Sequence, residues 1–590
     1  MHMQRSMSRN PPSIDRRGDG DHDRRVLEPA TLVDALETAA ASREGLNFYS
    51  GRGELQETLS YRQLRDEAVL GAQRLLQAGL VRGQTVGLVA ATNGDFVKTF
   101  FACQYAGLVP APLPLPTALG GREHYLEHLR RMTVSAKAGA VLSPAAMVSW
   151  VEQACERLPL TYVGTYAQLP SAAAQAQALP TPRPDDLAYL QFSSGSTRFP
   201  RGVAMTQRAV LANTGSIVRD GLRACAGDRC VSWLPMYHDM GLVGFLLTPL
   251  SCAISVDFLP THEFARRPLV WLDLISRNHA SLSYSPSFGY ELCVRRAERG
   301  VPAGLDLSSW RVAGIGGDMI RPHVLQRFAE TFAAAGFRSS ACVASYGMAE
   351  AALALSFAPL DAGLRVDRID TDRLEHEHEA HPPQDDAVGR TREFVHCGAI
   401  LPGHWVEVRD DHGQSLAERR VGVIHVRGPS LMREYFGEPE ETARVLSADG
   451  WLNTGDLGYL NEGEIVITGR ANDLIMLNGR NIWPQDLEWT AEAEIEEVRS
   501  GGVAAFSVEG EPADTVVVLF ECRSSDREAR AALRAALGGV LWSRFGIKAQ
   551  VVPVPLRALP QTSSGKLSRA KAKQLYLHGV FDETGVVVSA

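Results

Sequence analysis

Apolar positions along the chain alternate between two spacings from about residue 30 onward. The short, mainly apolar run from Thr85 to Ala90 predicts a strand, and the Asn93-Gly94-Asp95 sequence after it predicts a turn and a helix cap. From His323 to Phe337, apolar residues instead recur every four positions, and a glycine stands where a helix would end. Strand and helix patterns that follow one another in this way predict an α/β architecture.

Two interruptions of this pattern predict how the chain is divided. The stretch from Ser171 to Asp186 is rich in Ala, Gln and Pro, which indicates a surface connection leading into a strand from Leu187 to Phe192. The segment from Gly469 to Asp473 interrupts a later strand pattern, and a new α/β segment begins beyond it. We therefore expect an N-terminal domain over residues 26–471 and a smaller, mobile α/β domain over residues 472–590.

Composition narrows the class of protein. The 590 residues are 45% apolar and 22% charged, and the formal net charge of -8 gives no electrostatic reason to expect a nucleic-acid partner. The nine cysteines include no C-x-x-C pair, which indicates a reducing cytoplasm. The apolar stretch from Gly241 to Val256 is shorter than the roughly 20 residues of a membrane span, so we expect buried core there and no span. The first 25 residues have no apolar signal region and predict a disordered leader.

A loop of small and hydroxyl residues follows the strand predicted at Leu187 to Phe192. Its sequence from Ser193 to Gly202 (SSGSTRFPRG) lets backbone N–H groups converge on phosphate oxygens with little steric obstruction. The alternative is a polar surface loop. The G-x-x-x-x-G-K-[ST] pattern is absent, so a Walker A loop is excluded and a kinase acting on the γ-phosphate is disfavoured. Lys566, late in the chain, supplies a cation that a second domain would bring to this loop.

Further motifs follow the loop in a fixed order, and together they resemble the adenylate-forming (ANL) superfamily. They are WLPMYHDMGL at Trp233 to Leu242, SYGMAE at Ser345 to Glu350, WLNTGDL at Trp451 to Leu457, Gly469-Arg470, and PQTSSGKL at Pro560 to Leu567. Within that superfamily the wording is most similar to fatty acyl-AMP ligases in LQFSSGST at Leu190 to Thr197, PMYHDMG at Pro235 to Gly241, and GRNIWPQD at Gly479 to Asp486. The resemblance narrows the substrate to an acyl carboxylate. It implies a large N-terminal domain of packed mixed sheets with flanking helices and a small β-barrel, plus the mobile C-terminal lid.

The chemistry implied by the resemblance is limited by charge repulsion. A fatty carboxylate has a pKa of about 4, so at neutral pH it is already an anionic nucleophile and needs no general base. Its attack on the α-phosphorus of ATP brings it onto a polyanion, so the site must neutralise charge and hold the reactants in line. We expect Lys566 to bridge the acyl and α-phosphate oxygens as a mobile point charge.

The resemblance also assigns the remaining site residues. Glu350 would hold Mg2+, a metal that suits a hard oxygen ligand, and Asp456 would accept bonds from the ribose hydroxyls with help from Arg470. His238 would lie at the mouth of the acyl site. The pyrophosphate loop would use Ser193, Ser194, Gly195, Ser196, Thr197 and Gly202, and the adenine wall would comprise Gly316, Gly317, Asp318, Ser345, Tyr346, Gly347 and Met348. For Asp456 a turn carboxylate is the alternative, and for His238 a core histidine.

The chain departs from the superfamily pattern at three positions. Where the loop commonly reads Thr-Gly-x-Pro-Lys-Gly, this chain has Arg198 in place of the glycine and Arg201 in place of the lysine. The number of cations is kept, whereas the flexibility of the loop is reduced. The hinge position is Asn472, where Asp or Lys is common.

The segment from Ala358 to Val395 resembles the insertion that distinguishes acyl-AMP ligases from acyl-CoA ligases. There it is thought to restrain the small domain and suppress the use of CoA. The alternative is a surface excursion, since Asp, Glu, His and Pro dominate its middle. His376, His378 and His381 raise a metal-site hypothesis, but the neighbouring glutamates favour a solvated loop. The Gly314-x-Gly316-Gly317 sequence lacks the full dinucleotide fingerprint, so we do not expect NAD.

We therefore expect an enzyme that forms acyl-AMP and pyrophosphate from ATP and a fatty acid. The acyl group would then pass to the phosphopantetheine thiol of an acyl carrier protein, or of a carrier domain of a polyketide or nonribosomal peptide synthase, acting in trans. One alternative is a fatty acyl-CoA ligase with the same first half-reaction. The other is a nucleotide-binding protein without catalysis, which the joint presence of Lys566, Glu350 and Asp456 argues against.

Overall fold

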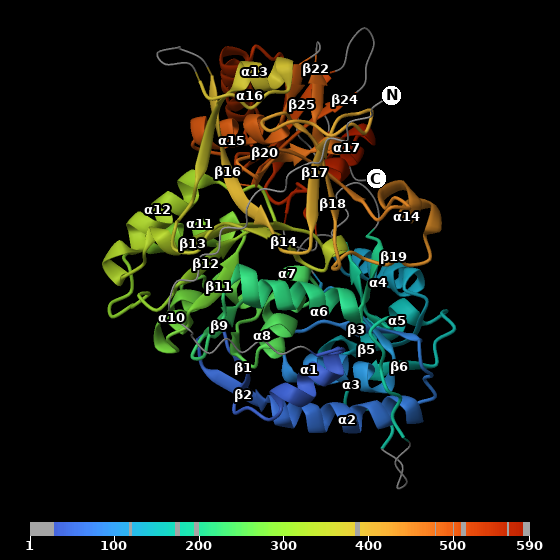
Figure 1. Cartoon of the computed structure of the whole chain (residues 1–590). Coiled ribbons are helices and arrows are strands. Elements are labelled where there is room, and N and C mark those ends of the chain that lie inside the picture. Colours follow the sequence, from blue (N-terminus) through green and yellow to red (C-terminus); the bar gives the residue numbers. More distant parts are fainter. Residues whose placement is uncertain are drawn as a thin grey trace, which may run out of the picture.

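The computed structural model is an assembly of five β-sheets with helices packed around them (Figure 1). The structure describes residues 29–116, 121–171, 178–193, 200–383, 390–477, 480–498, 501–508, 515–562 and 566–581. The leader predicted over residues 1–25 lies outside them. No described helix is long and apolar enough to cross a membrane.

A four-stranded parallel sheet forms one wall of the N-terminal region. Its order is β4-β3-β5-β6, with bounds β3 (Thr85–Val89), β4 (Val109–Leu113), β5 (Ala138–Ser143) and β6 (Tyr162–Thr165). The strand predicted from Thr85 is therefore confirmed, and the Asn93 side chain caps the next helix by accepting a hydrogen bond from Phe96 N. The surrounding helices are α1 (Leu32–Ala39), α2 (Tyr61–Gln77), α3 (Gly94–Ala106), α4 (Gly121–Ser135) and α5 (Val148–Cys155).

The largest sheet has 14 strands and provides the floor of the site. Its path is β17-β18-β20-β21-β16-β14-β13-β12-β11-β9-β10-β1-β2, and β15 pairs with β16. The parallel strands in this path are β1 (Gly45–Tyr49), β9 (Arg229–Ser232), β10 (Ser255–Phe258), β11 (Leu282–Ser285), β12 (Val312–Ile315) and β13 (Cys342–Gly347). They are buried under helices α6 (Gln207–Ser216), α9 (Thr261–Arg266), α10 (Leu269–Arg277), α11 (Ser287–Ala297) and α12 (Pro322–Phe332). Val324, Phe328 and Phe332 of α12 are buried, and Gly336 has the left-handed conformation expected of a helix stop.

The antiparallel part of the same sheet continues toward the C-terminal region. Its strands are β14 (Ala354–Phe357), β15 (Val366–Asp370), β16 (Thr391–Ile400), β17 (Trp405–Arg409), β18 (Gly422–Arg427), β20 (Leu452–Asn461) and β21 (Glu464–Arg470). Strand β2 (Leu55–Ser60) is also antiparallel, but it pairs with β1 at the opposite end of the path. The pairings of the described strands follow an open path, so closure into a small β-barrel stays a prediction.

A three-stranded sheet carries the predicted phosphate loop. Strand β7 (Leu187–Phe192) has the bounds that the sequence predicts, and it pairs with β8 (Gly202–Thr206), which pairs in turn with β19 (Glu434–Tyr435). Helix α14 (Pro439–Val445) follows β19.

The apolar stretch from Gly241 to Val256 is buried core, as predicted. It forms a broken helix of α7 (Asp239–Leu242), π-helix η3 (Val243–Leu247) and α8 (Thr248–Ser251) before entering β10.

Residues after Asp473 pack mainly around their own apolar clusters. The elements are β22 (Ile475–Leu477), β23 (Arg480–Ile482), α15 (Pro484–Glu494), β24 (Val503–Val508), β25 (Thr515–Cys522), α16 (Arg527–Phe545), β26 (Gln550–Pro555) and α17 (Arg569–Leu577). Pro484 opens a helix as predicted, and Thr515 opens a strand. In Figure 1 these orange-to-red elements lie at the top, beside α13 (Thr371–Glu377). The predicted α/β class is confirmed, whereas the domain boundary at residue 471 stays a prediction.

Candidate active site

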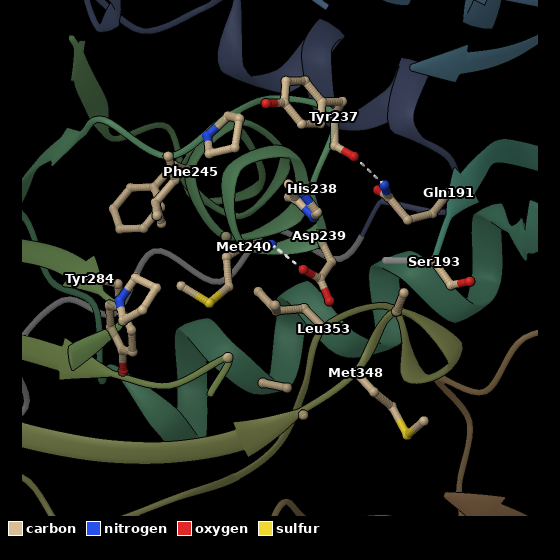
Figure 2. Close-up of a pocket in the computed structure, with 18 of the residues that line it drawn as sticks. Gln191, Ser193, Tyr237, His238, Asp239, Met240, Phe245, Tyr284, Met348 and Leu353 are labelled. Atoms are coloured by element: carbon tan, nitrogen blue, oxygen red, sulfur yellow. Dashed lines mark hydrogen bonds between the residues drawn. The ribbon is translucent and has the colours of Figure 1, made fainter. Parts of the chain in front are cut away.

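One large cavity lies where the carboxyl ends of several parallel strands meet. Its volume is about 1300 Å3, and the residues that line it follow directly after β9, β11, β12 and β13. Ligands of α/β proteins commonly bind at this edge of the sheet. In Figure 2, the lining residues Gln191 and Ser193 lie on one side of the view, and Phe245 and Tyr284 lie on the other.

The cavity collects most of the described residues that the sequence assigns to a site. Its lining includes Ser193, His238, Gly317, Ser345, Tyr346, Gly347, Met348, Glu350, Arg470, Asn472 and Lys566. Four predicted residues do not line it, namely Gly202, Gly316, Asp318 and Asp456. Ser194, Gly195, Ser196 and Thr197 lie outside the described residues.

The two ends of the predicted phosphate loop are tied to each other. Ser193 N donates to the Arg201 carbonyl at 2.9 Å, and Arg201 N donates to Ser193 Oγ at 3.2 Å. Gly202 begins β8 and pairs with Phe192. Its carbonyl accepts from Phe436 N at 2.7 Å. These bonds hold the base of the loop as a narrow hairpin at the cavity wall.

Asp456 lies just behind the cavity wall and faces two donors. Its Oδ2 accepts from the Tyr346 hydroxyl at 2.8 Å, and its Oδ1 is 3.2 Å from Arg470 Nε. Asp456 and Arg470 are paired across β20 and β21. Asp456 raises the pKa of Arg470, so the guanidinium stays charged at neutral pH. A fixed carboxylate of this kind is a strong acceptor for hydroxyl groups.

Glu350 is held by a tyrosine from a distant part of the chain. The Tyr435 hydroxyl donates to Glu350 Oε1 at 2.8 Å, and Met432 N donates to the Glu350 carbonyl at 2.7 Å. Burial raises the pKa of Glu350, and the bond from Tyr435 partly opposes this effect. Arg201 stacks on the Tyr435 ring at 5.2 Å and forms an ion pair with Glu441. The substituted arginine of the loop therefore takes part in the shell that orients Glu350.

Lys566 reaches the cavity from the C-terminal region. Its Nζ donates to the Gly317 carbonyl, on the loop after β12. The ammonium is also close enough to lower the pKa of Asp239, although burial of that carboxyl has the larger, opposite effect. Thr562 N donates to the Lys566 carbonyl at 2.7 Å. The ammonium of Lys566 thus enters a region that holds two half-buried carboxylates, Asp239 and Glu350.

His238 lies at the centre of the cavity beside Tyr237 and Asp239 (Figure 2). The centroids of the His238 and Tyr237 rings are 5.1 Å apart. Gln191 Nε2 donates to the Tyr237 carbonyl at 2.6 Å, which ties this segment to strand β7.

Asp318 and Gly316 lie at the edge of the predicted adenine wall. Asp318 is exposed, and its Oδ1 accepts from Met319 N at 2.8 Å. Gly316 is buried, with a site for Cβ only 2.9 Å from Ser345 Oγ, so a larger residue would displace that wall.

Sequence reasoning assigned no role to Gln191, Asp239, Tyr435 and Glu441. Gln191 and Asp239 stand inside the motifs at Leu190 to Thr197 and Trp233 to Leu242, which offered a signal. Tyr435 and Glu441 lie outside these sequence motifs. The pairing of β19 with β8 brings them to the cavity.

The end of the cavity opposite Ser193 is apolar. It is lined by Ile217, Val218, Leu222, Ala224, Phe245, Ile254, Leu282 and Phe357, with the thiols of Cys230 and Cys252 among them. Burial raises the pKa of Cys252 to about 12, so this thiol is neutral. Such a lining can hold a hydrocarbon chain.

The segment from Ala358 to Val395 contacts the C-terminal region. Ile369, Leu374, Ala380 and Phe394 share a buried apolar cluster with Trp483. Arg480 Nη2 is 2.6 Å from Glu375 Oε2, and Arg392 Nη1 is 2.8 Å from Asp486 Oδ2. This segment is therefore packed core over β15, α13 and β16. The histidines near residue 378 form no metal-ligand group among the described residues.

The predicted hinge lies at the junction of the two regions. Asn472 is exposed, lines the cavity and belongs to the 3-10 helix η7 (Ala471–Asp473). Asp473 Oδ2 is 2.9 Å from Arg569 Nη1, which also pairs with Glu488. The backbone beside Asn472 is thereby fixed to the C-terminal region.

The chain matches a known protein family, several named relatives and a solved structure. A family model described as AMP-binding enzyme matches residues 36–436. A protein of Caulobacter vibrioides, provisionally named an acyl-CoA synthetase, is 56% identical over 95% of this chain and 97% of its own length. The medium-chain-fatty-acid--[acyl-carrier-protein] ligase JamA of Moorena producens is 30% identical over 94% of this chain and 96% of its own. A solved structure from work on fatty acyl-adenylate ligases of E. coli and L. pneumophila has a TM-score of 0.88 and 45% identity, covering 93% of this chain and 99% of that one.

Proposed function

Because the chain belongs to the AMP-binding enzyme family and is an acyl-adenylate-forming ligase, we propose that it activates a fatty acid with ATP and passes the acyl group to a carrier protein. The observation that carries the proposal is the composition of one cavity. An apolar end, two half-buried carboxylates and the ammonium of Lys566 share it. Relatives named as ligases for fatty acids and acyl carrier proteins support the same substrate class.

The reaction needs charge neutralisation more than proton transfer. The fatty carboxylate is ionised at neutral pH, and it must approach the α-phosphate of ATP. Lys566 supplies positive charge from one side, and its bond to the Gly317 carbonyl is one that an anionic oxygen of the substrates can replace. The new bond joins the carboxylate oxygen to the α-phosphorus, and the bond to pyrophosphate breaks. No proton is transferred in this step.

The nucleotide is positioned by residues around Asp456. Its carboxylate, held by Tyr346 and Arg470, accepts bonds from the ribose hydroxyls. Gly317 and Ser345 to Met348 flank the adenine, and the loop that starts at Ser193 holds the phosphates. His238 lies between this part and the apolar end, where the acyl carboxylate enters.

The residues present fit a magnesium ion at Glu350. Its half-buried carboxylate is a hard oxygen ligand, and the Tyr435 hydroxyl fixes its orientation. When bound, the ion neutralises charge on the phosphates of ATP. Tyr435 keeps Oε2 of Glu350 available, because its own hydroxyl engages Oε1.

Replacing Tyr435 with Phe tests this orientation. We expect the Mg2+ concentration needed for half-maximal pyrophosphate release to rise about 10-fold or more, because loss of a partner of a metal ligand typically costs 10–100-fold in affinity. Tyr105→Phe is the matched control, since its hydroxyl donates to Glu37 at 2.5 Å outside the cavity lining. An unchanged Mg2+ dependence in Tyr435→Phe would remove Tyr435 from this role.

The identity of the acyl acceptor distinguishes the proposed ligase, which uses a carrier protein, from a fatty acyl-CoA ligase. The provisional name of the Caulobacter relative favours CoA as acceptor, whereas the name of JamA favours a carrier protein. A further relative, the long-chain-fatty-acid--AMP ligase FadD32 of Mycolicibacterium smegmatis, is named for the adenylate itself. Incubation with ATP, a fatty acid and either CoA or a holo carrier protein, followed by mass spectrometry, distinguishes them. We expect acyl-AMP to accumulate and acyl carrier protein to form. Efficient acyl-CoA formation would instead favour a fatty acyl-CoA ligase.

The ion pair between Glu375 and Arg480 can be removed to test whether the segment from Ala358 to Val395 restrains the C-terminal region and suppresses the use of CoA. Deletion of the whole segment is unsuitable, because it would remove half of β16, which lies between β14 and β21. Arg480→Gln removes one link, while Glu375 keeps its pair with Arg390 at 2.8 Å. If the link restrains the C-terminal region, we expect acyl-CoA formation to rise about fivefold or more, the effect of roughly 1 kcal/mol of coupling.

The control for this test lies in the same segment. Arg368 bonds Thr391 within the segment and makes no ion pair with the C-terminal region among the described residues, so Arg368→Gln should leave acyl-CoA formation unchanged. Equal activity with CoA in Arg480→Gln and wild type, with adenylation intact, would show that this contact does not control the acceptor.

A further inference from the structure

Two π-helical turns bound the apolar end of the cavity. Helix α6 continues into π-helix η2 (Ile217–Gly221), and η3 stands on another wall. Ile217 and Val218 line the cavity from the first turn, and Phe245 lines it from the second. Because π-turns are rare and gather at functional sites, two of them around one space indicate that these walls are shaped for a ligand.

The η2 turn is closely fitted to its surroundings. A Cβ atom at Gly221 would lie 2.7 Å from Phe357 Cε2, a ring that also lines the cavity. Arg223, just after the turn, has a φ of 46°, a conformation that costs free energy in a residue with a side chain. The tight fit at Gly221 and the positive φ of Arg223 both occur within a few residues of Val218, which lines the apolar end of the cavity.

A second space lies on the outer side of the same turn. This groove has a volume of about 380 Å3, and its lining includes the apolar residues Pro184, Leu211 and Ala212 as well as Arg208 and Arg219. Among the described residues, Val218 alone lines both the groove and the cavity. Its side chain is buried, with 3% exposed. In the part of the chain that the structure describes, Val218 is thus the residue that the two spaces share, and we call it the partition between the acyl space and the outer groove.

We propose that Val218 sets the upper limit of acyl-chain length, because the terminal carbons of the fatty-acid substrate reach this valine. The inference rests on the proposed adenylation of a fatty acid. No charged side chain lines the cavity beside Val218 within Ile217 to Ala224, so a hydrocarbon terminus fits there. Removing the partition connects the cavity to the groove, and a longer chain then gains contact with Leu211 and Ala212.

The test compares Val218→Ala with Ile217→Ala in a panel of saturated straight-chain fatty acids, assayed by pyrophosphate release. Ile217 lines the cavity but not the groove, so its truncation enlarges the same space without opening the partition. We expect Val218→Ala to accept longer chains than wild type, with a gain in kcat/KM of up to roughly fourfold for each added methylene that becomes buried. Ile217→Ala should keep the wild-type length limit. Val218→Leu, which thickens the partition conservatively, should shift the limit to shorter chains.

A double variant tests where the longer chain goes. Ala212→Trp fills the outer groove, so Val218→Ala combined with Ala212→Trp should restore the wild-type limit. The proposal is overturned if Val218→Ala keeps the wild-type limit, if Ile217→Ala extends it equally, or if the extension survives Ala212→Trp. Adenylation of no fatty acid by wild type would instead contradict the proposed function itself.

Discussion

Replacing Lys566 with Ala is expected to lower the rate of acyl-AMP formation by at least about 100-fold while ATP binding is largely kept. Removing one group that stabilises transition-state charge typically costs 10²–10³ in kcat. In the structure the ammonium of Lys566 reaches Gly317 and acts on Asp239, so its charge is delivered to the cavity from the C-terminal region. Pyrophosphate release measures the rate, and calorimetric titration with ATP measures binding.

A neighbouring lysine provides the control for this experiment. Lys571 of α17 lies 3.4 Å from His124 Nε2 and does not line the cavity. Lys571→Ala should therefore keep the adenylation rate. If Lys566→Ala turned over ATP and fatty acid as fast as wild type, the charge-neutralisation mechanism would be wrong.

Replacing Glu350 with Gln is expected to have the second large effect. The amide keeps the shape of the side chain and its bond to Tyr435 but removes the negative charge that would attract Mg2+. We expect kcat for adenylation to fall about 100-fold or more at a fixed Mg2+ concentration, with partial recovery when Mg2+ is raised. Glu521→Gln, at a buried carboxylate in the C-terminal sheet whose Oε1 accepts from Leu559 N, is the control.

The pH dependence of the same residue has a defined sign. Burial raises the pKa of Glu350, so the carboxylate begins to be protonated at a higher pH than an ordinary glutamate. Adenylation should therefore be lost as pH falls through this raised pKa, and it should be kept above it. Because Tyr435 stabilises the ionised form, Tyr435→Phe should move this acid limb to higher pH. A limb that stays in place would show that another group controls it.

Local signals in the sequence predicted the elements that carry the site. Strand β7, the helix that starts at Pro484 and the stop at Gly336 occur where turn residues, proline and glycine indicated. These predictions succeed because the physical causes act within a few residues of one another. The resemblance to adenylate-forming enzymes likewise named Lys566 and Glu350, which the cavity brings together.

Contacts between distant segments could not be predicted from the sequence. Tyr435 meets Glu350 only because β19 pairs with β8, a register that no local pattern of apolar residues specifies. The π-turns at Ile217 and Val243 follow no period that distinguishes them from α-helix. The partition at Val218 depends on the shapes of two spaces, and shape arises only when all walls are packed.

Strand β16 pairs with three other strands, and this pairing affects how the protein unfolds locally. It pairs with β14 and β21 in the large sheet and also with β15, whose residue Ile369 packs against Trp483. Fraying of this strand would release both the edge of the cavity and the apolar contact with the C-terminal region. Amide hydrogens of β15 and β16 therefore belong to one cooperative unit, and mechanical or thermal loosening of the C-terminal region would propagate into the sheet along a shared ladder.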